Sequence, residues 1–175
     1  CIKIITNSIK KLITDYPDFP KKGIIFKDIF PLLGNPEEFR EVIKTMSDSP
    51  IFKNAEAIIA IDARGFIFGS AISIYLSKPM IAARKPGKLP GHLISKSYDL
   101  EYGSNSLSIQ KDALDNYSSF AIVDDLLATG GTVKCILEIL SESNKKIKGL
   151  SVLIELKDLK GRDKLGIPVD SLITF

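Results

Sequence analysis

The sequence has few of the residues that several protein classes require. It contains no tryptophan, one histidine and two cysteines among 175 residues. A single histidine, His92, argues against a histidine-based metal site or a Ser-His-Asp triad, and we assign it no role. Cys1 and Cys135 show no CxxC spacing, which argues against a disulfide framework and favours a reducing, cytoplasmic compartment.

Long uninterrupted apolar runs and strong net charge are also absent. The longest apolar region, residues 55–76, is broken by Asp62 and Arg64. Within a bilayer each of these charges would cost about 3 kcal/mol, so the region is interpreted as strand, loop and helix with no membrane association. The net charge is only +3 and basic blocks are missing, which argues against nucleic acid and suits a small anionic ligand.

What the sequence does contain is a regular alternation of apolar strands and helical patterns. This order predicts one α/β domain over residues 1–175, with a mostly parallel central sheet flanked by helices. An alternating segment at about 94–110 predicts a hairpin or flexible flap. Strands are predicted at 24–26, 55–62, 79–84, 118–125, 147–156 and 167–175, and helices at 2–14, 36–46, 66–77 and 131–143.

The loop ATGGT, residues 128–132, follows a predicted strand and opens a predicted helix. The first backbone N–H groups of a helix lack intrahelical partners and lie at the positive end of its dipole. Gly130 and Gly131 permit close backbone approach, and Thr129 and Thr132 add hydroxyl donors, so a phosphate suits this loop. The alternative is an ordinary Gly-Gly turn with Thr132 as the N-cap of the helix.

Two adjacent carboxylates, Asp124 and Asp125, precede this loop at the carboxyl end of a buried strand. Their mutual repulsion costs on the order of 4 kcal/mol near a protein surface, so a ligand is expected to use them. Neighbours on a regular strand point to opposite faces, which argues against a shared proton. The hydroxyls of a sugar phosphate suit both carboxylates, and a divalent cation at Asp124 and Asp125 is a further option.

This combination of an apolar strand, two acids, a short spacer and TGGT resembles the phosphoribosyl pyrophosphate motif of type I phosphoribosyltransferases. The resemblance implies that Asp124 and Asp125 hold the ribose hydroxyls. It also implies a 5-phosphate site made of Ala128, Thr129, Gly130, Gly131 and Thr132.

Six segments, this motif included, resemble in the same order those of the adenine-specific branch of this family. The resemblance implies a glycosyltransferase of purine salvage that uses Mg2+ and adenine, makes AMP and pyrophosphate, and forms a homodimer. The matching segments are residues 17–33, 62–69, 84–91, 97–114, 123–132 and 155–165.

By this resemblance, the segments around 62–65 and 84–88 bind pyrophosphate. Arg64 is expected to fork onto pyrophosphate oxygens and to be catalytic, while Gly65 allows close backbone approach. The basic loop is expected to reach the neighbouring subunit, although a solvated basic loop is the alternative. The full pyrophosphate set is Asp62, Ala63, Arg64, Gly65, Arg84, Lys85, Lys88 and Tyr102.

The flap carries the second catalytic candidate. By resemblance it closes over the reacting centre and excludes water. Glu101 would manage the proton of the purine, which requires a pKa raised toward neutrality by burial. An exposed glutamate in a hairpin is the alternative.

Adenine is expected to bind by resemblance at Ile25, Phe26, Lys27 and Leu156. Backbone N–H and C=O groups at Ile25 match the adenine edge and would reject hypoxanthine, and Phe26 would stack on the base. Lys27 stands where the family usually has arginine, and lysine lacks the planar fork. Leu156 covers the other purine face or is simply a core residue.

Two other functions stay open at this stage. One is a regulator that keeps the ligand site without catalysis, but no helix-turn-helix pattern precedes residue 50. The other is the same chemistry on hypoxanthine, guanine, xanthine or orotate, which Lys27 keeps open.

Overall fold

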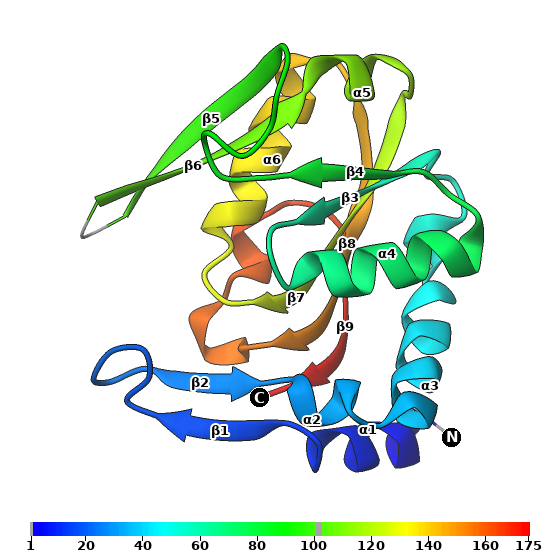
Figure 1. Ribbon diagram of the computed structural model, residues 1–175, viewed down its shortest axis with the longest axis vertical. Coiled ribbons are helices and arrows are strands. Elements are labelled where there is room, and N and C mark those ends of the chain that lie inside the picture. Colours follow the sequence, from blue (N-terminus) through cyan, green and yellow to red (C-terminus); the bar gives the residue numbers. More distant parts are fainter. Residues whose placement is uncertain (1, 101–102) are drawn as a thin grey trace. The chain divides into compact units, whose positions relative to one another are not determined.

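The computed structural model describes residues 2–100 and 103–175 (Figure 1). The chain divides into two compact units, residues 1–44 and residues 45–175. The second unit carries the central sheet, the phosphate-loop candidate and the two aspartates.

The first unit is built from short elements around an aliphatic core. It contains α1 (Ile2–Lys10), β1 (Thr14–Pro17), β2 (Ile25–Asp28), α2 (Phe30–Leu33) and the first turns of α3 (Pro36–Ser47). β1 and β2 pair as an antiparallel hairpin. The sequence pattern predicts no strand at β1, because all four of its side chains are exposed. The buried residues of this unit include Ile9, Ile13, Ile29, Leu32 and Val42.

The second unit is organised around a five-stranded parallel sheet of order β4-β3-β7-β8-β9. Its strands are β3 (Ala57–Ile61), β4 (Met80–Ala83), β7 (Ser119–Leu127), β8 (Lys146–Glu155) and β9 (Val169–Thr174). The predicted parallel sheet is therefore confirmed. Because all five strands run the same way, the carboxyl ends of β3, β7 and β8 meet at one edge, where ligands of such folds bind.

Helices cover both faces of this sheet. α4 (Gly65–Leu76) packs on β3 and β7, and its Gly69 lies so close to Ala60 that a Cβ there would be 2.5 Å from the alanine methyl. α6 (Gly131–Glu142) packs on the opposite face, where Ile136 joins Ile59 and Ile122 in the main apolar cluster. Alternate residues of the central strands thus face different helices, as the period of two requires.

A second hairpin lies beside α6 (Figure 1). It consists of β5 (Leu93–Leu100) and β6 (Gly103–Gln110), in full antiparallel register from Leu93↔Gln110 to Leu100↔Gly103. The predicted hairpin at about 94–110 is confirmed as a hairpin, and its flexibility stays a prediction. The short helices of this unit are η1 (Pro50–Phe52), α5 (Lys111–Asp115), η2 (Lys157–Leu159) and η3 (Arg162–Lys164).

Candidate functional site

The two adjacent aspartates lie near the carboxyl end of β7, facing the start of α4. The Asp124 Oδ1 atom accepts a hydrogen bond of 2.8 Å from the backbone N–H of Asp125. A Cβ added to Gly65 would be 2.9 Å from the same oxygen, so only glycine lets α4 begin this close to β7. Burial, and next the neighbouring Asp125 carboxylate, raise the pKa of Asp124 well above its usual range.

Arg64 contacts the second aspartate directly. Its Nη2 atom is 2.6 Å from Asp125 Oδ2, and the Asp125 side chain is only 9% exposed. Strand alternation predicted that Asp124 and Asp125 would face opposite ways, whereas both carboxyl groups reach the segment 62–65. β7 stays paired with β8 on both sides of Asp125, so the pairing of the strand does not explain this departure. One arginine therefore neutralises part of the paired negative charge.

A second arginine–aspartate pair lies at the end of β3. Arg84 Nε donates to Asp62 Oδ2 at 2.9 Å, and its guanidinium carbon is 5.7 Å from the centre of the Phe66 ring. The peptide bond between Asp62 and Ala63 is cis. The predicted segment 62–65 and the first residue of the predicted basic loop are therefore brought together within one chain.

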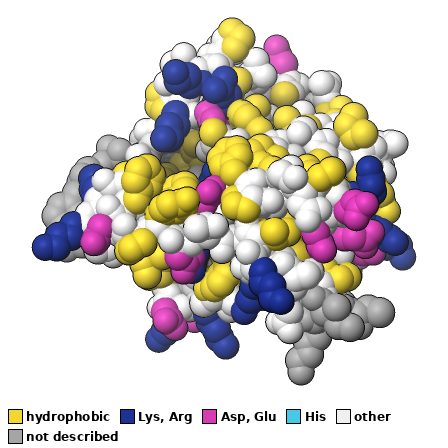
Figure 2. Space-filling model, turned by 60° about the horizontal axis from the view of Figure 1, so that its bottom comes forward, with side chains coloured by type: hydrophobic (Ala, Val, Ile, Leu, Met, Phe, Trp, Pro, Cys, Tyr) yellow, Lys and Arg dark blue, Asp and Glu magenta, His cyan; other side chains and the backbone are white. Residues whose placement is uncertain are grey.

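The rest of the basic loop, with Lys85 and Lys88, follows Arg84 in the chain. Arg84 exchanges two backbone hydrogen bonds with Ser108 of β6, at 2.8 and 3.0 Å, while Lys85 and Lys88 are exposed. On the face shown in Figure 2, Lys and Arg side chains are interspersed with Asp and Glu, without one continuous basic field. The exposed lysines are thus available to an anion.

The phosphate-loop candidate has the backbone shape that its glycines predicted. Gly130 has φ of 87° and precedes the first residue of α6, and no side chain caps that end within the described chain. The alternative of Thr132 as N-cap is wrong, since its hydroxyl instead bonds the Tyr98 hydroxyl at 2.9 Å. The first N–H groups of α6 are consequently left for a ligand or water.

The segment that contains Gly161 packs against this loop. A Cβ on Gly161 would be only 2.3 Å from the carbonyl oxygen of Ala128, and one on Gly130 would be 3.2 Å from the Gly161 carbonyl oxygen. The two glycine backbones therefore interlock. Sequence reasoning placed Gly161 in a family-like segment but gave it no role.

Leu156 lies directly beside the loop. Its N–H donates to the Leu127 carbonyl at 2.9 Å, immediately before Ala128, and the side chain is partly exposed. Leu156 is therefore at the ligand edge of the sheet and not in the buried core, as its predicted contact with a base requires.

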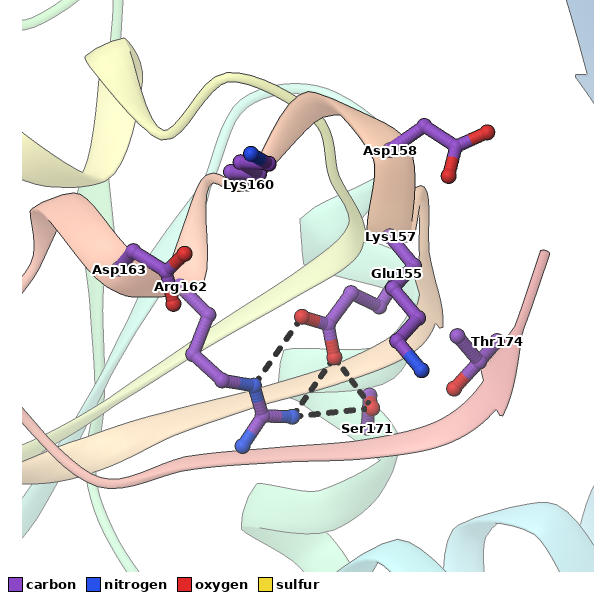
Figure 3. A pocket seen from close by; sticks show the side chains of 8 residues that line it. All are labelled: Glu155, Lys157, Asp158, Lys160, Arg162, Asp163, Ser171 and Thr174. Carbon is purple, nitrogen blue, oxygen red and sulfur yellow. Dashed lines mark hydrogen bonds and ion pairs between the residues drawn. The ribbon is translucent and has the colours of Figure 1, made fainter.

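A cavity of about 760 Å³ opens next to Leu156 (Figure 3). Within it, Glu155 accepts hydrogen bonds from Arg162 Nη2 at 2.6 Å, Arg162 Nε at 3.1 Å and Ser171 at 2.8 Å. The Arg162 hydrogen bond is the main reason that the pKa of Glu155 is lowered. Arg162 thereby ties the segment containing Gly161 to β8. The lining residues are Glu155, Lys157, Asp158, Lys160, Arg162, Asp163, Ser171 and Thr174.

The base-binding candidates in the first unit, Ile25, Phe26 and Lys27, are consecutive residues of β2 and differ in exposure. Ile25 is 56% exposed, and the Phe26 ring meets the Phe19 ring edge-on at 5.2 Å. Lys27 is buried, and its Nζ atom is 2.8 Å from Asp15, its direct partner in the hairpin register. The lysine that departs from the family pattern therefore has a carboxylate partner within its own hairpin.

Two predicted residues, Glu101 and Tyr102, lie outside the described residues. Their roles stay predictions. The contact that sequence reasoning missed is the one that Tyr98 makes to Thr132, because pairing between a hairpin and a distant helix leaves no local pattern.

The comparisons with known proteins agree with this geometry. Residues 32–167 match the model of the phosphoribosyl transferase domain. This match makes the protein a phosphoribosyltransferase, an enzyme that transfers a glycosyl group.

Individual relatives show which kind of phosphoribosyltransferase this chain is similar to. The chain is 60% identical over 172 residues to the adenine phosphoribosyltransferase of Prochlorococcus marinus (strain MIT 9211), covering 98% of this chain and 100% of that protein. The crystal structure of adenine phosphoribosyltransferase from Thermoanaerobacter pseudethanolicus superposes with a TM-score of 0.92 at 42% identity, covering 97% and 99% of the two chains. The Saccharomyces cerevisiae enzyme, solved with an imino-altritol bisphosphate and adenine, gives 0.88 at 33% identity, covering 97% and 99%. The chain belongs to the adenine phosphoribosyltransferase family.

Within residues 2–100 and 103–175, none of the helices has both the length and the apolar character needed to cross a bilayer.

Proposed function

We propose that the protein transfers ribose 5-phosphate from phosphoribosyl pyrophosphate to adenine, giving AMP and pyrophosphate, with the ribose held where β7 meets α6. The observation that carries the proposal is the arrangement of Asp124 and Asp125 just before a glycine loop that opens a helix. A sugar phosphate is the ligand class that suits both features: hydroxyls donate to carboxylates, and phosphate oxygens accept from N–H groups.

In this proposal the 5-phosphate occupies the loop 128–132. Gly130 at positive φ turns the backbone toward the ligand, and the hydroxyls of Thr129 and Thr132 supply further donors. The ribose hydroxyls then donate to Asp124 and Asp125, which lie at the same strand end. Either protonation state of Asp124 can accept such a bond, so its raised pKa is compatible with the role.

The pyrophosphate leaving group is assigned to the segment 62–65 and the basic loop. Arg64 is the central cation, because it already lies at 2.6 Å from one ribose carboxylate and its planar fork matches phosphate oxygens. Arg84 is held at the same sheet edge by Asp62. Lys85 and Lys88, which are exposed, are proposed to complete the cationic set in the site of a second copy.

The chemistry that follows is mainly electrostatic. When the glycosidic bond to pyrophosphate lengthens, positive charge develops on the ribose and negative charge on the leaving group. Carboxylates on the sugar side and guanidinium groups on the leaving-group side stabilise both charges in fixed positions. Glu101 is proposed to take the proton that adenine loses at N9, and Tyr102 to contact pyrophosphate.

Adenine is proposed to bind at Ile25, Phe26 and Lys27 of the β1–β2 hairpin, and Leu156 is a further proposed contact. The exposed side chain of Ile25 and the aromatic Phe26 offer apolar contact to a flat base, while the hairpin backbone reads its edge. Lys27 forms an ion pair with Asp15 inside the hairpin, which offsets part of its charge. We therefore propose that backbone N–H and C=O groups, and not the Lys27 side chain, recognise adenine.

Mg2+ is proposed as the metal of the reaction. Among the described residues, no three His, Cys, Asp or Glu side chains cluster into a cage for a metal ion. Mg2+ suits such a site, because it typically binds one or two carboxylates together with substrate phosphates. Asp124 and Asp125 would hold it, and bound Mg2+ would neutralise charge on the pyrophosphate oxygens.

A homodimer and a cytoplasmic location are also part of the proposal. The exposed lysines of the basic loop would complete the site of a second copy. The unpaired, buried thiol of Cys135 is compatible with a reducing compartment. Sedimentation velocity at micromolar concentration tests the dimer, and a single species of monomer mass would contradict it.

The function is tested by giving the purified protein phosphoribosyl pyrophosphate, Mg2+ and one base at a time, and measuring pyrophosphate release. We expect turnover with adenine and little with hypoxanthine, guanine, xanthine or orotate. Release with hypoxanthine but not adenine would contradict the base assignment. No release with any base would instead favour a ligand-binding regulator.

A further inference from the structure

We propose that Tyr98 is a positioning residue for phosphoribosyl pyrophosphate, acting through Thr132 of the 5-phosphate loop; this inference rests on the proposed function of that loop. The Tyr98 hydroxyl and the Thr132 Oγ1 atom are 2.9 Å apart. Tyr98 belongs to the β5–β6 hairpin, whereas Thr132 is the second residue of α6. The bond therefore links the hairpin to the end of the helix where the phosphate is assigned.

The chemistry of the two hydroxyls sets the direction of this bond. Each hydroxyl has one hydrogen to donate and can also accept. A phosphate oxygen needs the Thr132 hydrogen, so Thr132 is free to serve the ligand only if Tyr98 is the donor between the two. In that arrangement the Tyr98 hydroxyl fixes the rotation of the Thr132 hydroxyl with its hydrogen directed at the ligand. Less rotational freedom is then lost on binding.

The tyrosine ring makes a second contact to the same loop. A Cβ on Gly131 would lie 3.0 and 3.1 Å from the Cε2 and Cδ2 atoms of Tyr98, so the ring lies against the Gly131 backbone. The ring therefore fixes where the hydroxyl sits, and removal of the hydroxyl alone leaves this packing in place. Tyr98→Phe should therefore remove only the hydrogen bond to Thr132 and keep the packing of the ring on Gly131.

Further contacts hold β5 along α6, so the Tyr98 position does not depend on the hairpin tip. The Cys135 thiol donates to the Lys96 carbonyl at 2.9 Å, and Lys96 Nζ is 2.5 Å from Glu142 Oε1. Lys96 and Tyr98 are two residues apart on the strand and so share a face, as the period of two requires. β5 is thus attached at the start, the middle and the end of the helix.

The test is a double-mutant cycle on Tyr98→Phe and Thr132→Val, with kcat and the KM for phosphoribosyl pyrophosphate measured in saturating adenine. Tyr98→Phe should raise the KM for phosphoribosyl pyrophosphate about threefold to tenfold, the range of one neutral hydrogen bond, and leave kcat within about twofold. In the Thr132→Val background, the same change should alter that KM less than about twofold. In a Thr132→Ser background, which keeps a hydroxyl, the full effect should return.

Tyr75→Phe is the matched control, since Tyr75 is 51% exposed on α4, and it should leave both constants unchanged. An unchanged KM in Tyr98→Phe, or an equal increase with and without the Thr132 hydroxyl, would overturn the proposal while leaving the phosphate site intact. If Thr132→Val itself has no effect on the KM for phosphoribosyl pyrophosphate, the phosphate assignment fails, and the role of Tyr98 fails with it. Thermal unfolding of every variant verifies that each is folded.

Discussion

Replacement of Gly161 by alanine should damage the phosphate loop without disturbing the local backbone of Gly161 itself. Gly161 has φ of −60° and ψ of −40°, which alanine adopts readily. The new methyl group, however, would be 2.3 Å from the Ala128 carbonyl oxygen and 3.2 Å from both the Ala128 carbonyl carbon and Leu127 Cδ1. Because the closest atom belongs to the backbone of the loop, a side-chain rotation cannot relieve the contact.

The size of the effect follows from this distance. An ordinary contact needs about 1 Å more separation than 2.3 Å, so the loop or the Gly161 segment must move by roughly that amount. Overpacking of this kind costs about 1–3 kcal/mol of unfolding free energy. A displacement of about 1 Å at a substrate-positioning loop can reduce the rate by about 100-fold. We therefore expect kcat/KM for phosphoribosyl pyrophosphate to fall about 10-fold to 100-fold.

The assay separates loop displacement from general destabilisation. Isothermal titration calorimetry, well below the unfolding temperature, should show weaker binding of ribose 5-phosphate to the Gly161→Ala variant. Gly34→Ala is the matched control, since Gly34 has φ of −72° and an added Cβ would be 3.5 Å from its nearest neighbour, the Pro31 carbonyl oxygen. The control should keep wild-type affinity and kcat/KM.

Wild-type affinity for ribose 5-phosphate in Gly161→Ala would refute the reasoning, because it would mean that the loop position does not depend on the Gly161 contact. Equal losses in Gly34→Ala and Gly161→Ala would refute it as well. In that case glycine replacement in general, and not the distance to Ala128, would be responsible.

Three further outcomes are expected. Asp124→Asn combined with Asp125→Asn should raise the KM for phosphoribosyl pyrophosphate by at least about tenfold, since both carboxyl groups proposed to accept from the ribose hydroxyls are lost. An unchanged KM would show that neither residue binds the ribose. Glu101→Gln should lower kcat more than it raises either KM, and unaltered kcat would exclude Glu101 from proton transfer. Glu155→Gln should lower the unfolding temperature at pH 7, because the hydrogen bond from Arg162 lowers the pKa of Glu155 in the folded state. The stabilisation from the ionised Glu155 is therefore complete above the pKa of the unfolded chain and is lost as the pH falls through the lower pKa of the folded protein. A difference in unfolding temperature that persists undiminished at the lowest pH would contradict this account.

The inner part of the sheet could be predicted from the sequence, because β3 and most of β7 and β8 are runs of buried, mainly apolar residues. The strand predicted at 147–156 is observed at Lys146–Glu155, and the helix predicted at 131–143 is observed at Gly131–Glu142. Burial on both faces gives such strands a continuous apolar pattern that local reasoning can detect. β1 has no such pattern: all four of its residues are exposed, and only pairing with β2 defines it.

The residue types of the site could be predicted, but their partners could not. Asp124, Asp125 and the glycine loop are adjacent in sequence, so their proximity follows from chain connectivity. The contact between Arg64 and Asp125 depends on β3 and β7 being neighbours in the sheet, which strand order alone determines. The interlock between Gly161 and Ala128 likewise depends on the return of the chain after β8. No periodicity encodes either contact.

The arginine pairs explain how carboxylates can persist beside a site for an anion. Asp125 is buried and in contact with Arg64, and Asp62 accepts from Arg84, so both negative charges have a cationic partner. Loss of a partner from a buried charge is strongly destabilising, and these pairs therefore keep the carboxylates ordered before the substrate arrives. The same guanidinium groups are the proposed ligands of pyrophosphate. In the proposed complex the partners change. The ribose hydroxyls take the place of arginine as hydrogen-bond donors to the aspartates, and the arginines donate to the pyrophosphate oxygens instead. The carboxylates of Asp125 and Asp62 thus complement the anion site, because they hold Arg64 and Arg84 within reach of it.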